Sequence, residues 1–373
     1  GRVITAPNAR TRPKRGCAGV MGEGAGMMRG MKASVLAAER LRSHRLTAPA
    51  ATMTDAAAHM LAVQSQDFLA GRWALGVRTK DTPSLSEVDA AFASGELVRA
   101  WTMRGTLHII PACDLGWVLS VTADRQRMQA ATRHRQLGID AELLSRAEIA
   151  LRARLRDGGQ SRAALFEVLQ GVGIDPRDQR GIHVLSALTV NGVLCQGPVV
   201  GKEQQFVLVD EHILVSDAPS DPLAELFVRY IDGHGPAGEA DFAWWAGLTL
   251  GQAREAVARA AGRVREIDDG LFVALAPARR VARADATYAL PAFDEYYISY
   301  ADRTRVCAPE HLAAVGPGKN GMVRATVVQD GRVVGTWTHA AASRGMPAEL
   351  FDPSVDAEAA ASALARFSRF IDA

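Results

Sequence analysis

Apolar residues recur along the chain in a pattern that repeats three times between residues 35 and 276. In each copy, stretches with helical spacing are followed by two alternating apolar stretches around a turn. The expected helices lie at 35–44, 54–63 and 85–93, at 141–156, 161–170 and 180–190, and at 222–232, 239–246 and 250–261. The expected strands lie within 97–110, at 193–195 and 206–209, and at 263–267 and 271–275. Each copy therefore predicts three helices closed by a β-hairpin.

Three helices closed by a β-hairpin form the winged-helix version of the helix-turn-helix, a motif that binds DNA in many proteins. Helical hairpins followed by a β-ribbon also occur in other folds, so the pattern alone leaves that alternative open. The three copies together favour the winged helix more strongly than one copy would.

The pattern becomes β-rich after residue 285. The expected strands lie at 288–291, 296–300, 323–329 and 333–337, and an amphipathic helix is expected at about 356–371. We therefore predict an α+β fold with three tandem winged-helix domains and a C-terminal β-barrel. The expected divisions are a flexible tail at 1–30, winged helices at 31–137, 138–218 and 219–282, and the barrel with its C-terminal helix at 283–373.

The composition is typical of a soluble globular protein, with 48% hydrophobic and 23% charged residues in a chain of 373. No run of 18 or more apolar residues is present, so we expect no membrane span. The four cysteines form no C-x-x-C pair, and the histidines lack the spacing of metal ligands. We expect a cytoplasmic monomer that needs no metal and no cofactor.

The formal net charge of +2 conceals an uneven distribution. Residues 1–137 carry 19 basic and 10 acidic side chains, whereas the rest of the chain carries 24 basic and 31 acidic ones. Part of this positive excess lies in the tail, which holds six basic residues and one acidic residue. A basic half is typical of a polyanion-binding site. Arginine supplies most of the basic residues, but codon bias in a GC-rich genome would have the same effect.

Familiar catalytic motifs are absent from the sequence, which has no G-x-S-x-G, H-E-x-x-H, P-loop or dinucleotide-binding fingerprint. A polar run, Gln64-Ser65-Gln66-Asp67, follows the second expected helix. On an extended segment Gln64 and Gln66 share one face, where two amides can orient a water and lie near a developing positive charge. Asp67 then points to the opposite face, and we expect it to cap a helix. A Gln-x-Gln run alone is common by chance.

Five segments together resemble the bacterial winged-helix DNA glycosylase family typified by AlkZ and YcaQ. They are Gln64–Asp67, Trp101–His108, Asp241–Leu248, Leu290–Tyr296 and Asp330–Trp337. The resemblance covers residues 32–373 and is to the AlkZ-like branch with Gln-x-Gln, not to the branch with Gln-x-Asp. It implies a monofunctional enzyme that unhooks interstrand crosslinks and releases bulky alkylated purines from double-stranded DNA. Self-resistance in producers of DNA-alkylating natural products is often associated with this branch.

The resemblance makes Gln64 and Gln66 the expected catalytic residues. A purine alkylated at N7 or N3 is cationic and leaves readily, so the enzyme needs only to stabilise the sugar cation and place a water. No lysine lies near the motif to form a Schiff base, which favours simple hydrolysis. The expected DNA-binding residues are Arg99, Arg104, Thr106 and His108 of the first hairpin, and possible channel residues are Asp294 and Arg303.

Several alternatives remain open at this point. Arg104 is alternatively a solvated turn residue. The polar residues Asp294, Glu295 and Arg303 alternatively form a buried ion pair that joins the barrel to the first repeat. The pair Trp244-Trp245 is more often a core element than a base-stacking platform. A winged-helix transcription regulator without catalysis is the alternative function, although the third helices at 85–93 and 251–261 carry few basic residues.

Overall fold

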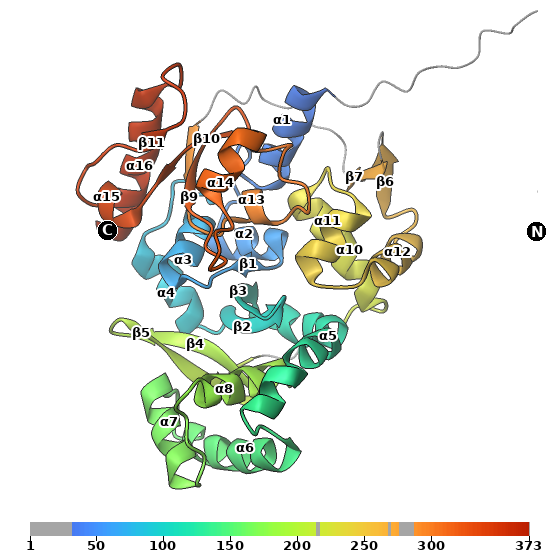
Figure 1. Ribbon diagram of the computed structural model, residues 1–373, viewed down its shortest axis with the longest axis vertical. Coiled ribbons are helices and arrows are strands. Elements are labelled where there is room, and N and C mark those ends of the chain that lie inside the picture. The colour runs from blue at the N-terminus through green and yellow to red at the C-terminus, as the bar shows by residue number, and fades with distance from the viewer. Residues whose placement is uncertain (1–31, 214–216, 268–269, 276–286, 373) are drawn as a thin grey trace, which may run out of the picture.

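The computed structural model describes residues 32–213, 217–267, 270–275 and 287–372, so the expected tail at 1–30 lies outside the described residues. The chain forms three helix-rich units and a C-terminal unit built around a sheet (Figure 1). The first unit and the helix that follows it comprise α1 (Ala33–Ser43), α2 (Met53–Met60), β1 (Val63–Gln64), α3 (Phe68–Gly76), α4 (Leu85–Ala93), β2 (Leu97–Met103), β3 (Thr106–Pro111), a 3-10 turn (Ala112–Asp114) and α5 (Leu115–Gln136).

The second and third units follow the same order of elements. The second comprises α6 (Ala141–Leu155), α7 (Arg162–Gly171), α8 (Arg180–Val190), β4 (Leu194–Val200), β5 (Glu203–Leu208) and α9 (Val209–His212). The third comprises α10 (Pro222–His234), α11 (Glu239–Ala246), α12 (Leu250–Arg259), β6 (Val264–Ile267) and β7 (Leu271–Ala274). The helices predicted for these two copies are confirmed to within about two residues at each end.

Each of the three units has an antiparallel bridge between the segment joining its first two helices and its hairpin. The residue between the first and second helices pairs antiparallel with the second strand of the hairpin, as Gln64 does with His108, Gln160 with Phe206 and Ala237 with Phe272. The hairpins of the first two units join into one sheet with the order β1-β3-β2-β4-β5. Gln64 therefore occupies a position that the fold constructs three times.

The helices predicted at 35–44, 54–63 and 85–93 are confirmed as α1, α2 and α4, although α2 ends three residues earlier than predicted. The prediction missed α3, so that α2, α3 and α4 are the helices that match those of the other two units. α2 ends at Met60 because Leu61 adopts a positive φ of 61°, and the chain then runs extended through Gln64. α3 begins after Asp67, whose carboxylate accepts a hydrogen bond from the Ala70 N–H at 3.1 Å. The capping role expected for Asp67 is thus confirmed. The long helix α5 was also not expected.

A glycine in α3 allows the segment after Gln64 to pack closely. A Cβ atom on Gly71 would lie 2.5 Å from the Ser65 Cβ, which is too close for any side chain. Two glycines within α3 and the polar run before it also obscure its helical pattern in the sequence. The glycine that lets the Gln64 segment pack closely against α3 therefore also weakens the helical pattern of α3, which is why the sequence did not predict this helix.

The C-terminal unit contains an open sheet, so the predicted barrel was wrong for the part of the chain that the structure describes. Its four strands have the order β11-β10-β9-β8. Residues 296–300 were expected to form a strand, but they lie in or just after the short helix α13, whose first N–H groups Asp294 caps. The elements are β8 (Thr287–Leu290), α13 (Glu295–Ile298), a 3-10 turn (Pro309–His311), α14 (Leu312–Val315), β9 (Ala325–Gln329), β10 (Arg332–Trp337), α15 (His339–Ala342), β11 (Glu349–Leu350) and α16 (Ala357–Asp372).

The first unit and the C-terminal unit share one hydrophobic core. Trp73 of α3 packs against Phe367 of α16, and its indole N–H donates to the Ala289 carbonyl at 2.8 Å. Arg78, just after α3, forms a buried two-pronged ion pair with Asp294 at 2.7 and 2.8 Å. The C-terminal unit is therefore fixed against the unit that carries Gln64. Among the described helices, none is long and apolar enough to cross a membrane.

Candidate active site

Gln64 is held at both its main chain and its side chain. Its backbone N–H donates to a carboxylate oxygen of Glu295 at 2.7 Å, and its side-chain oxygen accepts from Arg104 at 3.0 Å. Gln64 is 7% exposed, so little water competes for these bonds. Because a guanidinium group can only donate, the amide oxygen must face Arg104 and the NH₂ group must face away.

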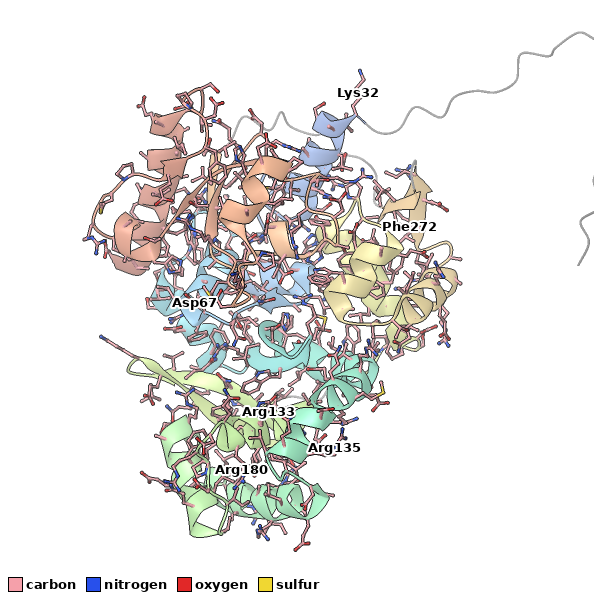
Figure 2. The ribbon with its side chains drawn as sticks, in the orientation of Figure 1. Lys32, Asp67, Arg133, Arg135, Arg180 and Phe272 are labelled. Carbon is pink, nitrogen blue, oxygen red and sulfur yellow. The ribbon has the colours of Figure 1, made fainter. Side chains whose placement is uncertain are left out.

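Gln66 lies two residues further along the extended segment and is exposed. Its side-chain oxygen accepts from the Leu107 N–H at 3.4 Å, a long and weak hydrogen bond. Ser65 pairs with Leu107 through its own N–H at 2.8 Å. Both glutamine side chains therefore contact the same hairpin, β2–β3, with Gln64 fixed and Gln66 accessible. Asp67, labelled in Figure 2, follows at the start of α3.

Arg104 directs its donors into the protein. It occupies the β2–β3 turn with a φ of 54°, and besides Gln64 it donates to the carbonyl of Trp245 in α11. The backbone approaches Gly247 so closely that a Cβ there would lie 3.1 Å from the Arg104 nitrogen. Arg104 thus links the Gln64 amide to the third unit. It is not a solvated turn residue, and its expected contact with DNA stays a prediction.

Arg99 and Thr106, the other two candidates near the turn of the first hairpin, donate hydrogen bonds to main-chain carbonyl groups. Arg99 is 9% exposed and donates twice to the Ser65 carbonyl, at 2.7 and 3.0 Å, and once to Gln196 at 2.7 Å. Burial lowers the pKa of Arg99 to about 10, so it stays charged at neutral pH. Thr106 is half-buried and donates to the Met103 carbonyl at 3.3 Å. Contacts of Arg99 and Thr106 with DNA stay predictions.

His108 is buried beside Arg104 and is neutral at physiological pH. Burial, followed by the charge of Arg104, lowers its pKa to about 3. Its Nδ1 lies 3.0 Å from the Thr102 hydroxyl and 3.1 Å from the Thr106 carbonyl, while Nε2 lies 3.5 Å from Arg104. The carbonyl requires a proton on Nδ1, so Nε2 presents a lone pair to Arg104.

Glu295 is a component of the site for which the sequence suggested a channel residue or a buried ion pair, but no contact with Gln64. It is fully buried, and its carboxylate accepts from the Gln64 N–H, from the Trp245 indole N–H at 3.1 Å and from the Ser299 hydroxyl. Burial alone would raise its pKa, but His234, whose Nε2 lies 3.8 Å from the carboxylate, and the charge of Arg104 hold it at about 2. The Glu295 carboxylate is therefore negatively charged at neutral pH and lies against the backbone of Gln64.

The two possible channel residues lie in different surroundings. Asp294 forms the buried ion pair with Arg78, which is the alternative that the sequence left open. Arg303 is half-buried near the surface, with its guanidinium 5.2 Å from the Trp244 ring centroid. Among the described residues, no group of three or more His, Cys, Asp or Glu side chains could hold a metal ion.

Folding stability is expected to fall as the pH is lowered from 6.5. In the unfolded chain a histidine has a pKa of about 6.5, whereas His108 in the folded protein has a pKa of about 3. Between these pH values His108 binds a proton only in the unfolded state, which lowers the stability of the fold. The contribution of Glu295 is lost later, between about pH 4.3, its unfolded value, and about 2. Urea unfolding at pH 7, 5.5 and 4.5 measures this slope. In the variant His108→Gln the fall should be shallower, and an unchanged slope would remove His108 as its source.

Comparison with known proteins gives consistent matches. A protein-family model described as "DNA glycosylase AlkZ-like" matches residues 57–370. A curated protein of Streptomyces sahachiroi, "Interstrand DNA cross-link repair glycosylase", is 26% identical over 310 residues, which are 78% of this chain and 82% of that protein. The solved structure "Streptomyces sahachiroi DNA glycosylase AlkZ" superposes with a TM-score of 0.75 at 22% identity, over 90% of this chain and 96% of the other. The mixed α+β fold of the two structures is therefore alike.

Proposed function

Because the chain belongs to the AlkZ-like DNA glycosylase family, we propose that it hydrolyses the N-glycosidic bond of cationic N7- or N3-alkylated purines in DNA. The observation that carries this proposal is the Gln64–Gln66 segment, with one amide fixed by Arg104 and the other accessible at the same hairpin. The name of the curated relative supports interstrand crosslinks as substrates, and we propose bulky adducts as substrates as well. Repair or self-resistance is the biological role that fits this chemistry.

The proposed reaction needs no general acid. The cationic purine leaves with the bonding electron pair and becomes neutral, water adds its hydroxyl to C1′, and the remaining proton passes to solvent. The NH₂ group of Gln64 faces away from Arg104 and donates to this water. The oxygen of Gln66, which the Leu107 N–H holds only weakly at 3.4 Å, accepts from the water. Amide oxygens near the sugar also stabilise its developing positive charge. Neutral bases leave poorly, so the two amides restrict the enzyme to cationic bases.

The division into domains is part of the proposal. We infer that the three units with a bridging residue are winged-helix domains, with boundaries near residues 31–137, 138–218 and 219–282. They hold double-stranded DNA against the β2–β3 hairpin. The third helix of the first unit, α4, carries Glu87 and Asp89, and Asp89 is paired with Arg72 at 2.7 Å. A helix with that charge is poorly suited to reading a major groove, which favours the enzyme over a regulator.

The deciding experiment uses duplex DNA that carries a single N7-alkylguanine. After incubation, alkaline cleavage converts each abasic site into a strand break that a gel resolves. We expect breaks at the modified guanine only, and a duplex joined by a nitrogen-mustard crosslink should separate into single strands. Absence of breaks with both simple and bulky adducts would overturn the proposed activity. Binding to undamaged operator-like DNA without base release would point to the regulator.

Replacing Arg104 with alanine is expected to lower the rate of base release by about tenfold. The variant removes the donor that fixes the Gln64 amide, so the amide samples other rotamers. Affinity for DNA should fall less than threefold, because the guanidinium is already engaged by Gln64 and Trp245. Single-turnover rates and fluorescence anisotropy separate the two effects. A large loss of affinity with an unchanged rate would instead support the direct phosphate contact.

A further inference from the structure

The two adjacent tryptophans of α11 have different surroundings. Trp245 is fully buried, and its indole N–H donates to Glu295. Trp244 is 45% exposed, although its indole N–H is fixed to the Ile298 carbonyl at 2.8 Å. A large aromatic ring that is held in orientation and left exposed is suited to stacking with a planar group. The prediction that a Trp pair belongs to the core thus holds for Trp245 alone.

Arg303 lies against this exposed ring. Its guanidinium is 5.2 Å from the Trp244 ring centroid and 5.5 Å from that of Tyr297. Within the part of the chain that the structure describes, this guanidinium makes no hydrogen bond and no ion pair, and its Nε is buried without a partner. Arg303 also lines a surface hollow of about 380 Å³. An oriented cation without a counter-charge is suited to binding an anion such as a phosphate.

Asp302 is the acidic residue that lines the same hollow. Its carboxylate accepts from the Thr304 hydroxyl at 2.7 Å and from the Thr304 N–H at 2.9 Å. These bonds turn the carboxylate oxygen toward Thr304, and the structure shows no ion pair between Asp302 and Arg303 among the described residues. The charge of Arg303 is therefore left for a ligand.

The Trp244–Arg303 pair is adjacent to the Gln64 site. The carbonyl of Trp245, the next residue, accepts from Arg104, which in turn donates to Gln64. Arg303 is close enough that its positive charge helps to lower the pKa of Arg104, after the larger effect of burial. Trp244 thus lies one residue away from the carbonyl that binds Arg104, and Arg303 contacts the Trp244 ring.

We propose that Trp244 and Arg303 bind an unpaired nucleotide of damaged DNA next to the Gln64 site. The guanidinium contacts the phosphate of this nucleotide, and the indole stacks on its base. An exposed aromatic ring combined with a basic group is the arrangement that proteins use for unstacked bases. This inference rests on the proposed function for the identity of the ligand, but not on the chemistry of Gln64 and Gln66.

The test uses two fluorescent duplexes of identical sequence, one intact and one with a tetrahydrofuran abasic analogue that leaves the opposite base unpaired. The analogue has no glycosidic bond, so binding is measured without catalysis. We expect the unmodified protein to prefer the analogue duplex, and Trp244→Ala to lose about tenfold in affinity for it. Its loss on the intact duplex should be less than twofold. Trp244→Phe, which keeps a stacking ring, should retain most of the preference.

Arg303→Ala should make the negative slope of log affinity against log salt concentration less steep by about 0.9, the value for one phosphate contact on duplex DNA. Arg344→Ala is the matched control, because Arg344 is exposed after α15 and its loss changes the net charge equally. Equal slopes for the two variants, or equal losses of Trp244→Ala on both duplexes, would overturn the proposal. Failure of base release from an alkylated duplex would overturn the proposed function and leave these binding results unaffected.

Discussion

Replacing Gln64 with alanine is expected to lower the rate of base release by about 100-fold, as removal of one preorganised catalytic hydrogen-bonding group does in other enzymes. The effect should be confined to the rate, because Gln64 is 7% exposed and presents little surface to DNA. Its backbone N–H donates to Glu295, and this bond does not depend on the Gln64 side chain. Folding stability and DNA affinity should therefore change little. Single-turnover kinetics with an N7-alkylguanine duplex measure the rate.

The chain offers a matched control for this variant. Gln160 occupies the same bridging position in the second unit, where it pairs with Phe206 as Gln64 pairs with His108. Gln160→Ala removes the same amide from the equivalent bridging position, and we expect an unchanged rate. The backbone settings differ in that the Gln160 N–H donates to the Phe206 carbonyl, whereas that of Gln64 donates to Glu295. Gln66→Ala should also lower the rate, since its oxygen is the proposed acceptor. Equal rates for Gln64→Ala and Gln160→Ala would exclude Gln64 from catalysis.

Replacing Glu295 with alanine is expected to destabilise the fold by about 3–5 kcal/mol, the usual effect of removing one member of a buried charged network. The change leaves the Gln64 N–H and the Trp245 indole N–H without an acceptor, and it removes the charge that faces Arg104. Urea unfolding measures the loss. Glu310→Ala, which removes an exposed glutamate from the nearby 3-10 turn, should stay within about 0.5 kcal/mol of the unmodified protein.

Glu295→Gln separates the stability of the fold from the position of Gln64. Glutamine has the same shape and keeps one acceptor oxygen, so this variant should fold with a smaller loss than alanine. Its rate of base release should still fall, because the NH₂ group replaces an oxygen that accepts from Gln64, Trp245 or Ser299. A variant that is destabilised but fully active per folded molecule would limit Glu295 to a structural role.

Local periodicity predicted the helices of the second and third units because most of them have a regular amphipathic pattern, and α6, α7, α10 and α12 begin at a side-chain N-cap. The failures have specific physical causes. α3 was missed because it is buried on most sides and contains two glycines, so it lacks a polar face. Residues 296–300 read as a strand because aromatic residues favour strands, yet Asp294 caps a helix there.

The site was predicted only as far as its local residues allow. The run Gln64–Asp67 and the turn at Arg104 are visible in the sequence, and the capping role of Asp67 follows from its type and place. Gln64 is oriented directly by Glu295 and, through Arg104, by Trp245. Trp245 and Glu295 lie 181 and 231 residues further along the chain. No periodicity links positions so far apart, so only the fold reveals them.

The residues that orient Gln64 come from three parts of the chain: Arg104 from the first unit, Trp245 from the third and Glu295 from the C-terminal unit. A fragment ending at residue 218 holds both glutamines and Arg104 but lacks the Trp245 carbonyl and the Glu295 carboxylate. Recombination that exchanged the first unit alone between distant relatives would separate the glutamines from the residues that orient them. We therefore expect the motif, the α11 tryptophan and the α13 glutamate to be inherited as one set, with substitutions among them that covary.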